Sequence, residues 1–141
     1  MVSFYHFWSS IYYIKQSFLT KRCSLRQILN VNQICFINPF LVNGTIQLLG
    51  DEQVQVMAET WFVEADCDEV NIKSEMFQTY GFTFGTYSWG DPVTISDQEQ
   101  SQTYRGEQLV HQNASSTFSI AFTASATTPG GKGFVLKWTC I

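Results

Sequence analysis

The sequence predicts an all-β fold, an antiparallel sandwich of two sheets. Two runs near the end of the chain, 117–123 and 133–140, alternate between apolar and more polar side chains, which is the period-two pattern of strands covering a core. A cluster of threonine, proline and glycine at 127–132 separates them and predicts a turn. The apolar positions of the two runs are Phe118, Ile120, Phe122, Phe134, Leu136 and Trp138.

Composition supports the same fold class. The 141 residues suffice for one domain with a sizeable core. Apolar residues make up 45%, aromatic residues 16% and charged residues only 14% of the chain, which excludes a disordered protein. Many aromatic side chains suit the two inner faces of a sandwich.

We expect the domain to comprise residues 31–141. Its first half contains three runs of strand character. We expect strands at 45–49, 53–64 and 69–73, with a turn at 66–68. In the longest run, one face would hold Val54, Val56, Ala58 and Phe62. Apolar residues interrupt the opposite, polar face at Met57, Trp61 and Val63, so the second half of this run is expected to be buried on both sides or bent.

The second half of the expected domain begins with an aromatic, glycine-punctuated region. Two strands, at about 80–87 and 92–96, would be joined by a turn at 89–92. The polar stretch 96–106 predicts an exposed loop, and 108–111 a brief strand.

Residues 1–30 form a leader or uncertain segment outside this domain. Three interpretations stay open: an atypical signal region, an amphipathic stretch facing a membrane, and a segment foreign to the domain. Residues 1–14 are too short and polar to span a bilayer, so membrane contact would require them to act as an anchor. Helical spacing of Leu25, Ile28 and Leu29 predicts a short helix at 17–29.

Charge and motifs exclude several function classes. Residues 1–30 hold four bases and no acid, whereas 31–141 hold four bases and twelve acids, so the domain is acidic and unsuited to binding nucleic acid. The histidines are His6 and His111, and no GxSxG or phosphate-binding loop accompanies them. The sequence therefore predicts no enzyme.

The cysteines and sequons favour a secreted, disulfide-bonded glycoprotein. The four cysteines, Cys23, Cys35, Cys67 and Cys140, form no CxxC pair, which argues against zinc. Four reduced, buried thiols are the alternative. Two Asn-x-Ser/Thr sequons begin at Asn43 and Asn113, beside turn signals, and predict glycosylation.

An acidic cluster between two predicted strands is the main candidate site. Glu64, Asp66, Asp68 and Glu69 lie within six residues. Three interpretations apply: a solvated turn, a calcium site built from Glu64, Asp66 and Asp68, or catalytic carboxylates. The aromatic side chains of Tyr87 and Trp89 are candidate binding anchors.

The motifs at 62–72, 118–123 and 133–138 resemble those of the CUB domain family. Its members have a phenylalanine and glutamate ending one strand, a cysteine and aspartate opening the next, and a closing glycine-phenylalanine strand. The terminal Trp138-Thr139-Cys140 is similar to that of divergent members. The cysteine that normally partners the one at Cys67 is absent.

The resemblance implies a jelly-roll-like sandwich with a Cys35–Cys140 disulfide. It also implies a calcium site using Glu64 and Asp68, with Asp66 compensating for Ser125, which replaces the family's aspartate. The implied function is an extracellular, non-catalytic module that recognises a protein or glycan through loops at the acidic end, with calcium as the only expected cofactor. The alternative is an accessory domain, or fragment, of a secreted protease.

Overall fold

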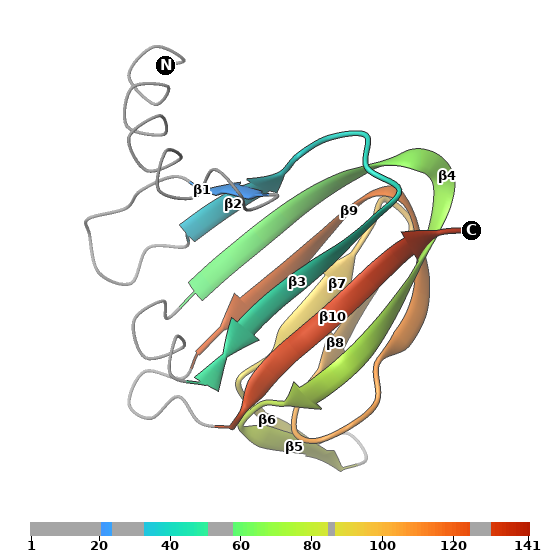
Figure 1. Ribbon diagram of the computed structural model, residues 1–141. Helices are drawn as coiled ribbons and strands as arrows, with labels where there is room; N and C mark the ends of the chain where they lie inside the picture. Colours follow the sequence, from blue (N-terminus) through green and yellow to red (C-terminus); the bar gives the residue numbers. More distant parts are fainter. Residues whose placement is uncertain (1–20, 24–32, 51–57, 85–86, 125–130) are drawn as a thin grey trace.

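The computed structural model describes residues 21–23, 33–50, 58–84, 87–124 and 131–141. Within these ranges the chain consists of β-strands and the loops that connect them (Figure 1). The strands are β1 Lys21–Cys23, β2 Gln33–Ile37, β3 Asn43–Leu49, β4 Ala58–Gln78, β5 Gly81–Phe84, β6 Tyr87–Gly90, β7 Val93–Ser96, β8 Ser101–Tyr104, β9 His111–Thr123 and β10 Gly133–Cys140.

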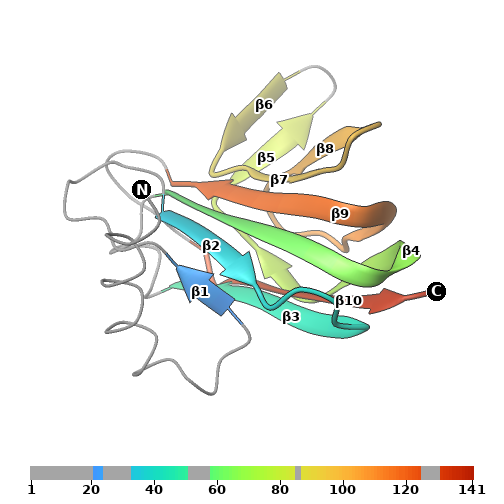
Figure 2. The same ribbon diagram turned by 90° about the horizontal axis from the view of Figure 1, so that it is seen from above.

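Two layers are built from one continuous sheet that folds over itself. The first layer has the order β1-β2-β4-β9-β7-β8, and the second consists of β3, β10, the end of β4 and the start of β9. Strands β4 and β9 are shared: the beginning of β4 pairs with β2 and with the end of β9, while the end of β4 pairs with β10 and with the start of β9. Figure 2 shows the layers facing each other from above. Apart from the parallel β2–β4 pair, these ladders are antiparallel, which confirms the predicted antiparallel sandwich.

Aromatic side chains fill the space between the layers. The ring of Phe134 on β10 lies 5.8 Å from Trp61 and 6.0 Å from Phe122, centroid to centroid. Phe118 on β9 and Trp138 on β10 are 5.9 Å apart. These contacts join the two layers, so the aromatic interior expected from the composition is confirmed.

The last two strands agree with the predicted alternation. On β9 and β10 the side chains of every predicted apolar position are buried; these are Phe118, Ile120, Phe122, Phe134, Leu136 and Trp138. The same holds for Val70 and Ile72 in the predicted strand 69–73. Period-two patterning therefore identified these strands correctly.

The face assigned to the long strand was wrong. Trp61 and Val63 are buried, whereas Phe62 is 41% exposed and stacks on Phe36 of β2 on the outer surface. Glu59 and Thr60 are buried together with Trp61, so this part of β4 is buried on both sides, as expected. The other predicted face positions, 54 and 56, lie outside the described residues.

Three predicted turns and loops contain strand residues. The turn expected at 66–68 lies inside β4, and the loop expected at 96–106 contains β8, which pairs with β7. In the aromatic region, β5 and β6 form the hairpin, so the expected turn at 89–92 is shifted. Residues 108–110 are not a strand, although His111 opens β9.

The N-terminal helix expected at 17–29 is contradicted where the chain is described. Residues 21–23 form β1, which pairs antiparallel with β2 and places Cys23 opposite Cys35. The rest of the expected helix lies outside the described residues. The domain boundary at residue 31 stays a prediction.

The predicted Cys35–Cys140 bridge is wrong, because Cys140 is bonded to Cys67. Strand β10 runs antiparallel to the end of β4, and its last residue pairs with Val70. Cys67 therefore lies beside Cys140, with 5.9 Å between their Cα atoms. Cys35 lies on β2, in the other layer, and is also disulfide-bonded. The structure has no free cysteine among the residues it describes.

Candidate functional site

A sharp bend in β4 forms one end of the sandwich. The β4–β9 register jumps there: Glu64 pairs with Thr117, and Glu69 with Ser115. Four residues of β4 thus lie opposite the single residue 116 of β9. Extra residues on one strand bend it and re-aim its side chains. Figure 1 shows β4 curling over at this end.

Backbone hydrogen bonds fix the bend. The chain before β3 runs along it, where the amide of Phe40 donates to the Glu64 carbonyl at 2.8 Å and the amide of Asp66 donates to the Leu41 carbonyl at 2.8 Å. On the other side, the amide of Ile141 donates to the Glu69 carbonyl at 3.1 Å. These hydrogen bonds satisfy backbone groups that a bulge would otherwise leave unpaired, and the disulfide joins Cys67 of the bend to Cys140 of the last strand.

An open cavity of about 600 Å³ lies beside the bend, and we call it the acidic pocket. It lies where β4, the β7–β8 turn and β9 meet. Four of its lining residues carry a carboxylate, and none of those described carries a positive charge. The lining residues are Asp68, Glu69, Asp97, Glu99, Gln100, Asn113, Ala114 and Ser115.

Asp97 organises the turn at the pocket wall. One carboxylate oxygen accepts from the amides of Glu99 at 2.8 Å and Gln100 at 2.9 Å, and the other accepts from the amide of Ser115 at 2.9 Å. These backbone hydrogen bonds, above all the one from Ser115, lower the pKa of the Asp97 carboxyl. The pocket therefore keeps this negative charge at neutral pH.

Amide side chains connect the strands around the pocket. Asn71 on β4 donates to the Asn113 side-chain oxygen at 2.8 Å, and the Asn113 amide donates to the Glu69 carboxylate at 3.4 Å. Gln100 donates to the Asn113 carbonyl at 2.9 Å. These hydrogen bonds tie Asn71, Asn113 and Gln100 to neighbouring strands, which makes this part of the pocket wall a structured surface.

The expected calcium ligands are not gathered into a site. Glu64, Asp66 and Asp68 are exposed side chains of β4, at and just before the bend. Among the described residues, no group of three or more His, Cys, Asp or Glu side chains could hold a metal ion. Ser125 lies outside the described residues.

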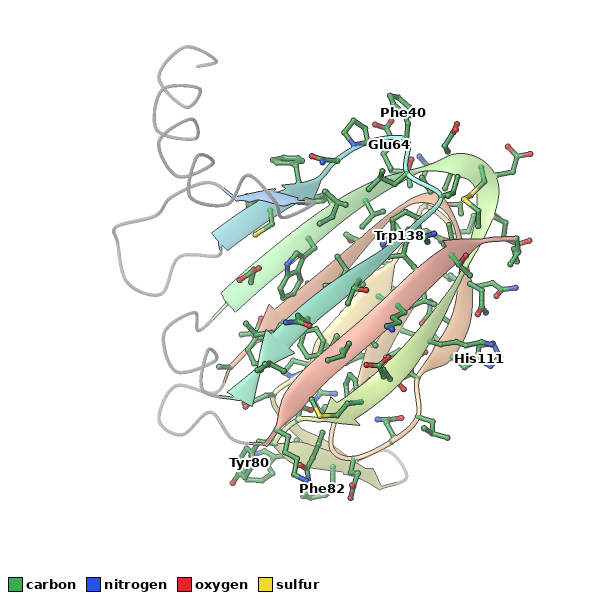
Figure 3. All side chains as sticks on the ribbon, viewed as in Figure 1. Phe40, Glu64, Tyr80, Phe82, His111 and Trp138 are labelled. Carbon is green, nitrogen blue, oxygen red and sulfur yellow. A yellow bond between two sulfur atoms is a disulfide. The ribbon has the colours of Figure 1, made fainter. Side chains whose placement is uncertain are left out.

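The predicted aromatic anchors lie at the other end of the sandwich. From Glu69 to Gln78, β4 runs about 30 Å at the usual rise per residue, and the β5–β6 hairpin follows. Figure 3 shows Tyr80 and Phe82 at the opposite end from Glu64. The acidic segment and the hairpin that carries Tyr87 and Trp89 therefore lie at opposite ends of the sandwich.

Trp89 nevertheless belongs to an exposed aromatic cluster. Its ring lies 4.8 Å from that of Tyr80 and 5.9 Å from that of Phe82, centroid to centroid, and 51% of Trp89 is exposed. Tyr87 lies on the same hairpin, and its backbone pairs with that of Phe84. The structure does not describe the Tyr87 side chain.

Sequence reasoning identified only part of the pocket. It singled out Asp68 and the acidic segment, and Asn113 only as a glycosylation site, but it missed Asp97 and Glu99, which approach from the β7–β8 turn. One signal was present: Asp97 followed by polar residues is typical of a turn closed by an aspartate side chain. The proximity of that turn to β9 depends on sheet order and has no local signal.

Comparison with known proteins supports the fold. No protein-family model matches the chain, and no curated protein sequence matches it. Among solved structures, the CUB1-EGF-CUB2 domain of human MASP-1/3 matches with a TM-score of 0.55 at 12% identity, over 85% of this chain and 45% of that one. The same domains of rat MASP-1 match with a TM-score of 0.46 at 15% identity, over 79% and 42%.

The similarity to the human MASP-1/3 structure supports a CUB-like sandwich fold. This chain covers less than half the length of that structure. No helix in the described ranges has the length and apolar character required to cross a membrane.

Proposed function

We propose that this domain is a non-catalytic recognition module of an extracellular protein and binds a basic group of a partner protein in the acidic pocket. The observation that carries the proposal is the pocket itself, where four carboxylates line one cavity without a basic side chain among its described lining residues. Carboxylates gathered in a concave surface focus a negative potential and attract cationic ligands.

Lysine and arginine side chains are the partner groups that fit this chemistry. A guanidinium or ammonium group supplies only hydrogen-bond donors, and the carboxylates and the amide oxygens of the pocket are acceptors. Asp68 and Glu99 are exposed, and no hydrogen bond or ion pair of their carboxylates is found within the described part of the chain. These two carboxylates are therefore available to a ligand. Sulfated or carboxylated glycans would be repelled.

The disulfide supports an extracellular setting. The Cys67–Cys140 bond joins the bend to the last strand, and such bonds persist mainly in secreted and extracellular proteins. The exposed sequon residue Asn43 agrees with this location. We do not assign calcium a role, since the expected ligands do not converge.

An accessory domain of a secreted protease is the alternative proposal. It is favoured by one observation: the similar MASP-1/3 structure contains this fold as one module of a CUB1-EGF-CUB2 arrangement. In that setting too the domain would act by binding, so both proposals share the same pocket.

Titration calorimetry with a synthetic lysine-glycine peptide tests the binding site. We expect the double variant Asp68→Asn/Glu99→Gln to bind roughly tenfold more weakly at low salt, from two exposed charge pairs, and added salt to weaken wild-type binding. The matched control is Glu75→Gln/Glu107→Gln, which removes two charges outside the pocket. Equal losses in both variants, or no binding by the wild type, would contradict the proposal.

A further inference from the structure

We propose that the two sequons of this chain have different roles: Asn43 carries an N-linked glycan, whereas Asn113 stays unmodified as a structural part of the acidic pocket. The inference rests on the proposed extracellular function, since such glycans are attached to secreted proteins. It separates two sites that are equivalent by sequence pattern alone.

Both asparagines lie in one row across the second layer. Asn43 of β3 pairs with Thr139 of β10, Thr139 pairs with Asn71 of β4, and Asn71 pairs with Asn113 of β9. Directly paired residues share one face of a sheet, and three strand spacings correspond to about 14 Å. Asn43 and Asn113 are thus on the same outer face, at opposite ends of the row.

At the Asn43 end of the row, the side chain is free to carry a glycan. Strand β3 pairs only with β10, so Asn43 stands on an edge strand. Its side chain is exposed and makes no hydrogen bond within the described ranges. Thr45, the third sequon residue, is exposed as well. A sugar on Asn43 can extend past this edge of the described sheet.

The middle residue of this sequon explains why its flanks point outward. Gly44 faces the core, where a Cβ atom would lie 2.6 Å from Nε1 of Trp138. The indole of Trp138 therefore packs directly on the Gly44 backbone, and strand alternation turns Asn43 and Thr45 to the solvent.

At the Asn113 end of the row, the side-chain amide is already engaged. Its nitrogen donates to Glu69 at 3.4 Å and its oxygen accepts from Asn71 at 2.8 Å. The third sequon residue, Ser115, donates its hydroxyl to the Thr117 carbonyl at 3.1 Å. Asn113 is the third residue of β9, where this strand pairs with β4.

A glycan on Asn113 would occupy the acidic pocket. The modified atom is the amide nitrogen that faces Glu69, and Asn113 is one of the lining residues. The first sugar would therefore lie among the carboxylates, fill the space meant for a ligand and disturb the bond to Glu69. We expect chains modified there to fold less well and to be depleted from the secreted protein.

Glycan mapping tests the assignment. The full chain is expressed behind a cleavable secretion signal in eukaryotic cells, and the secreted protein is treated with peptide N-glycosidase in heavy-oxygen water before peptide mass spectrometry. We expect the Asn43 peptide to carry the label and the Asn113 peptide to lack it. In gels, Asn43→Gln should remove the glycosidase-sensitive shift, and Asn113→Gln should retain it. A glycan on Asn113 in most of the secreted protein, or an unmodified Asn43, would overturn the assignment.

Two further readouts separate this inference from the proposed function. Asn113→Gln should lower the melting temperature by about 2–4 °C, the effect of losing one hydrogen-bonded contact, and Asn43→Gln should leave it unchanged in deglycosylated protein. Equal shifts would argue against a structural role for Asn113. Because the secretion signal is supplied and no peptide ligand is used, the mapping result is independent of lysine-peptide binding.

Discussion

Removing the Cys67–Cys140 disulfide is expected to destabilise the domain strongly. The bond closes a loop with a sequence separation of 73 residues. In the chain-entropy description, the stabilisation grows with the logarithm of loop length and amounts to about 4 kcal/mol here. For a domain of this size, such a loss corresponds to a melting temperature lower by on the order of 10 °C.

Urea denaturation of Cys67→Ala/Cys140→Ala, followed by tryptophan fluorescence, measures this loss. The wild-type protein under reducing conditions should be destabilised at least as much, since Cys35 is also disulfide-bonded. A decrease in the free energy of unfolding of less than about 1 kcal/mol would refute the idea that this disulfide stabilises the fold by restricting the conformations of the unfolded chain. A non-reducing peptide map that joined Cys140 to Cys35 would refute the pairing itself.

Two smaller perturbations test the packing and the pocket wall. Gly44→Ala places a Cβ atom 2.6 Å from the Trp138 indole and should lower the free energy of unfolding, measured by thermal denaturation, by about 1–3 kcal/mol. The control, Thr45→Ala at an exposed position, should change this free energy little. Equal effects of the two substitutions would contradict the close packing of Trp138 on Gly44. The pKa of Asp97 is lowered in the folded state, chiefly by the hydrogen bond from the Ser115 amide. The ionised carboxylate therefore stabilises the fold at pH values above the unfolded-state pKa of about 4, and this stabilisation is lost as the pH falls through the folded-state pKa. Asp97→Asn should flatten the melting temperature profile in that acidic range, and an unchanged profile would show that the carboxylate contributes nothing.

Local patterning was sufficient for the strands with one buried face. On β9 and β10 the apolar residues recur at every second position and lie between the layers. The alternation of apolar residues in the sequence is therefore sufficient to predict both strands. The same rule failed on β4, where Phe62 was assigned to the buried face and Trp61 to the opposite face, which apolar residues interrupt. Both are aromatic, and composition does not show which of two neighbouring apolar side chains faces the core.

The disulfide and the pocket could not be predicted because both depend on sheet order. Cys67 and Cys140 meet because β10 pairs with the end of β4, and Asp97 reaches β9 because β7 pairs with that strand. Neither pairing has a local sequence signal. The resemblance to CUB domains gave the correct architecture, but the cysteine pairing it implied did not apply to this chain.

The bend in β4 explains why the acidic pocket forms at this position. Before the bend the odd-numbered residues Trp61, Val63 and Ala65 face the core, and after it the even-numbered residues Val70 and Ile72 do. A regular strand would therefore turn one of any two consecutive residues inward.

Because the bulge reverses this alternation, the consecutive residues Asp68 and Glu69 are both exposed, and both line the pocket. Two adjacent carboxylates directed to one side repel each other, and the Asn113 amide, which donates to Glu69, offsets part of that cost. The order of apolar residues in the sequence thus encodes the bulge, and the bulge creates the local excess of negative charge through which we propose the domain binds its partner.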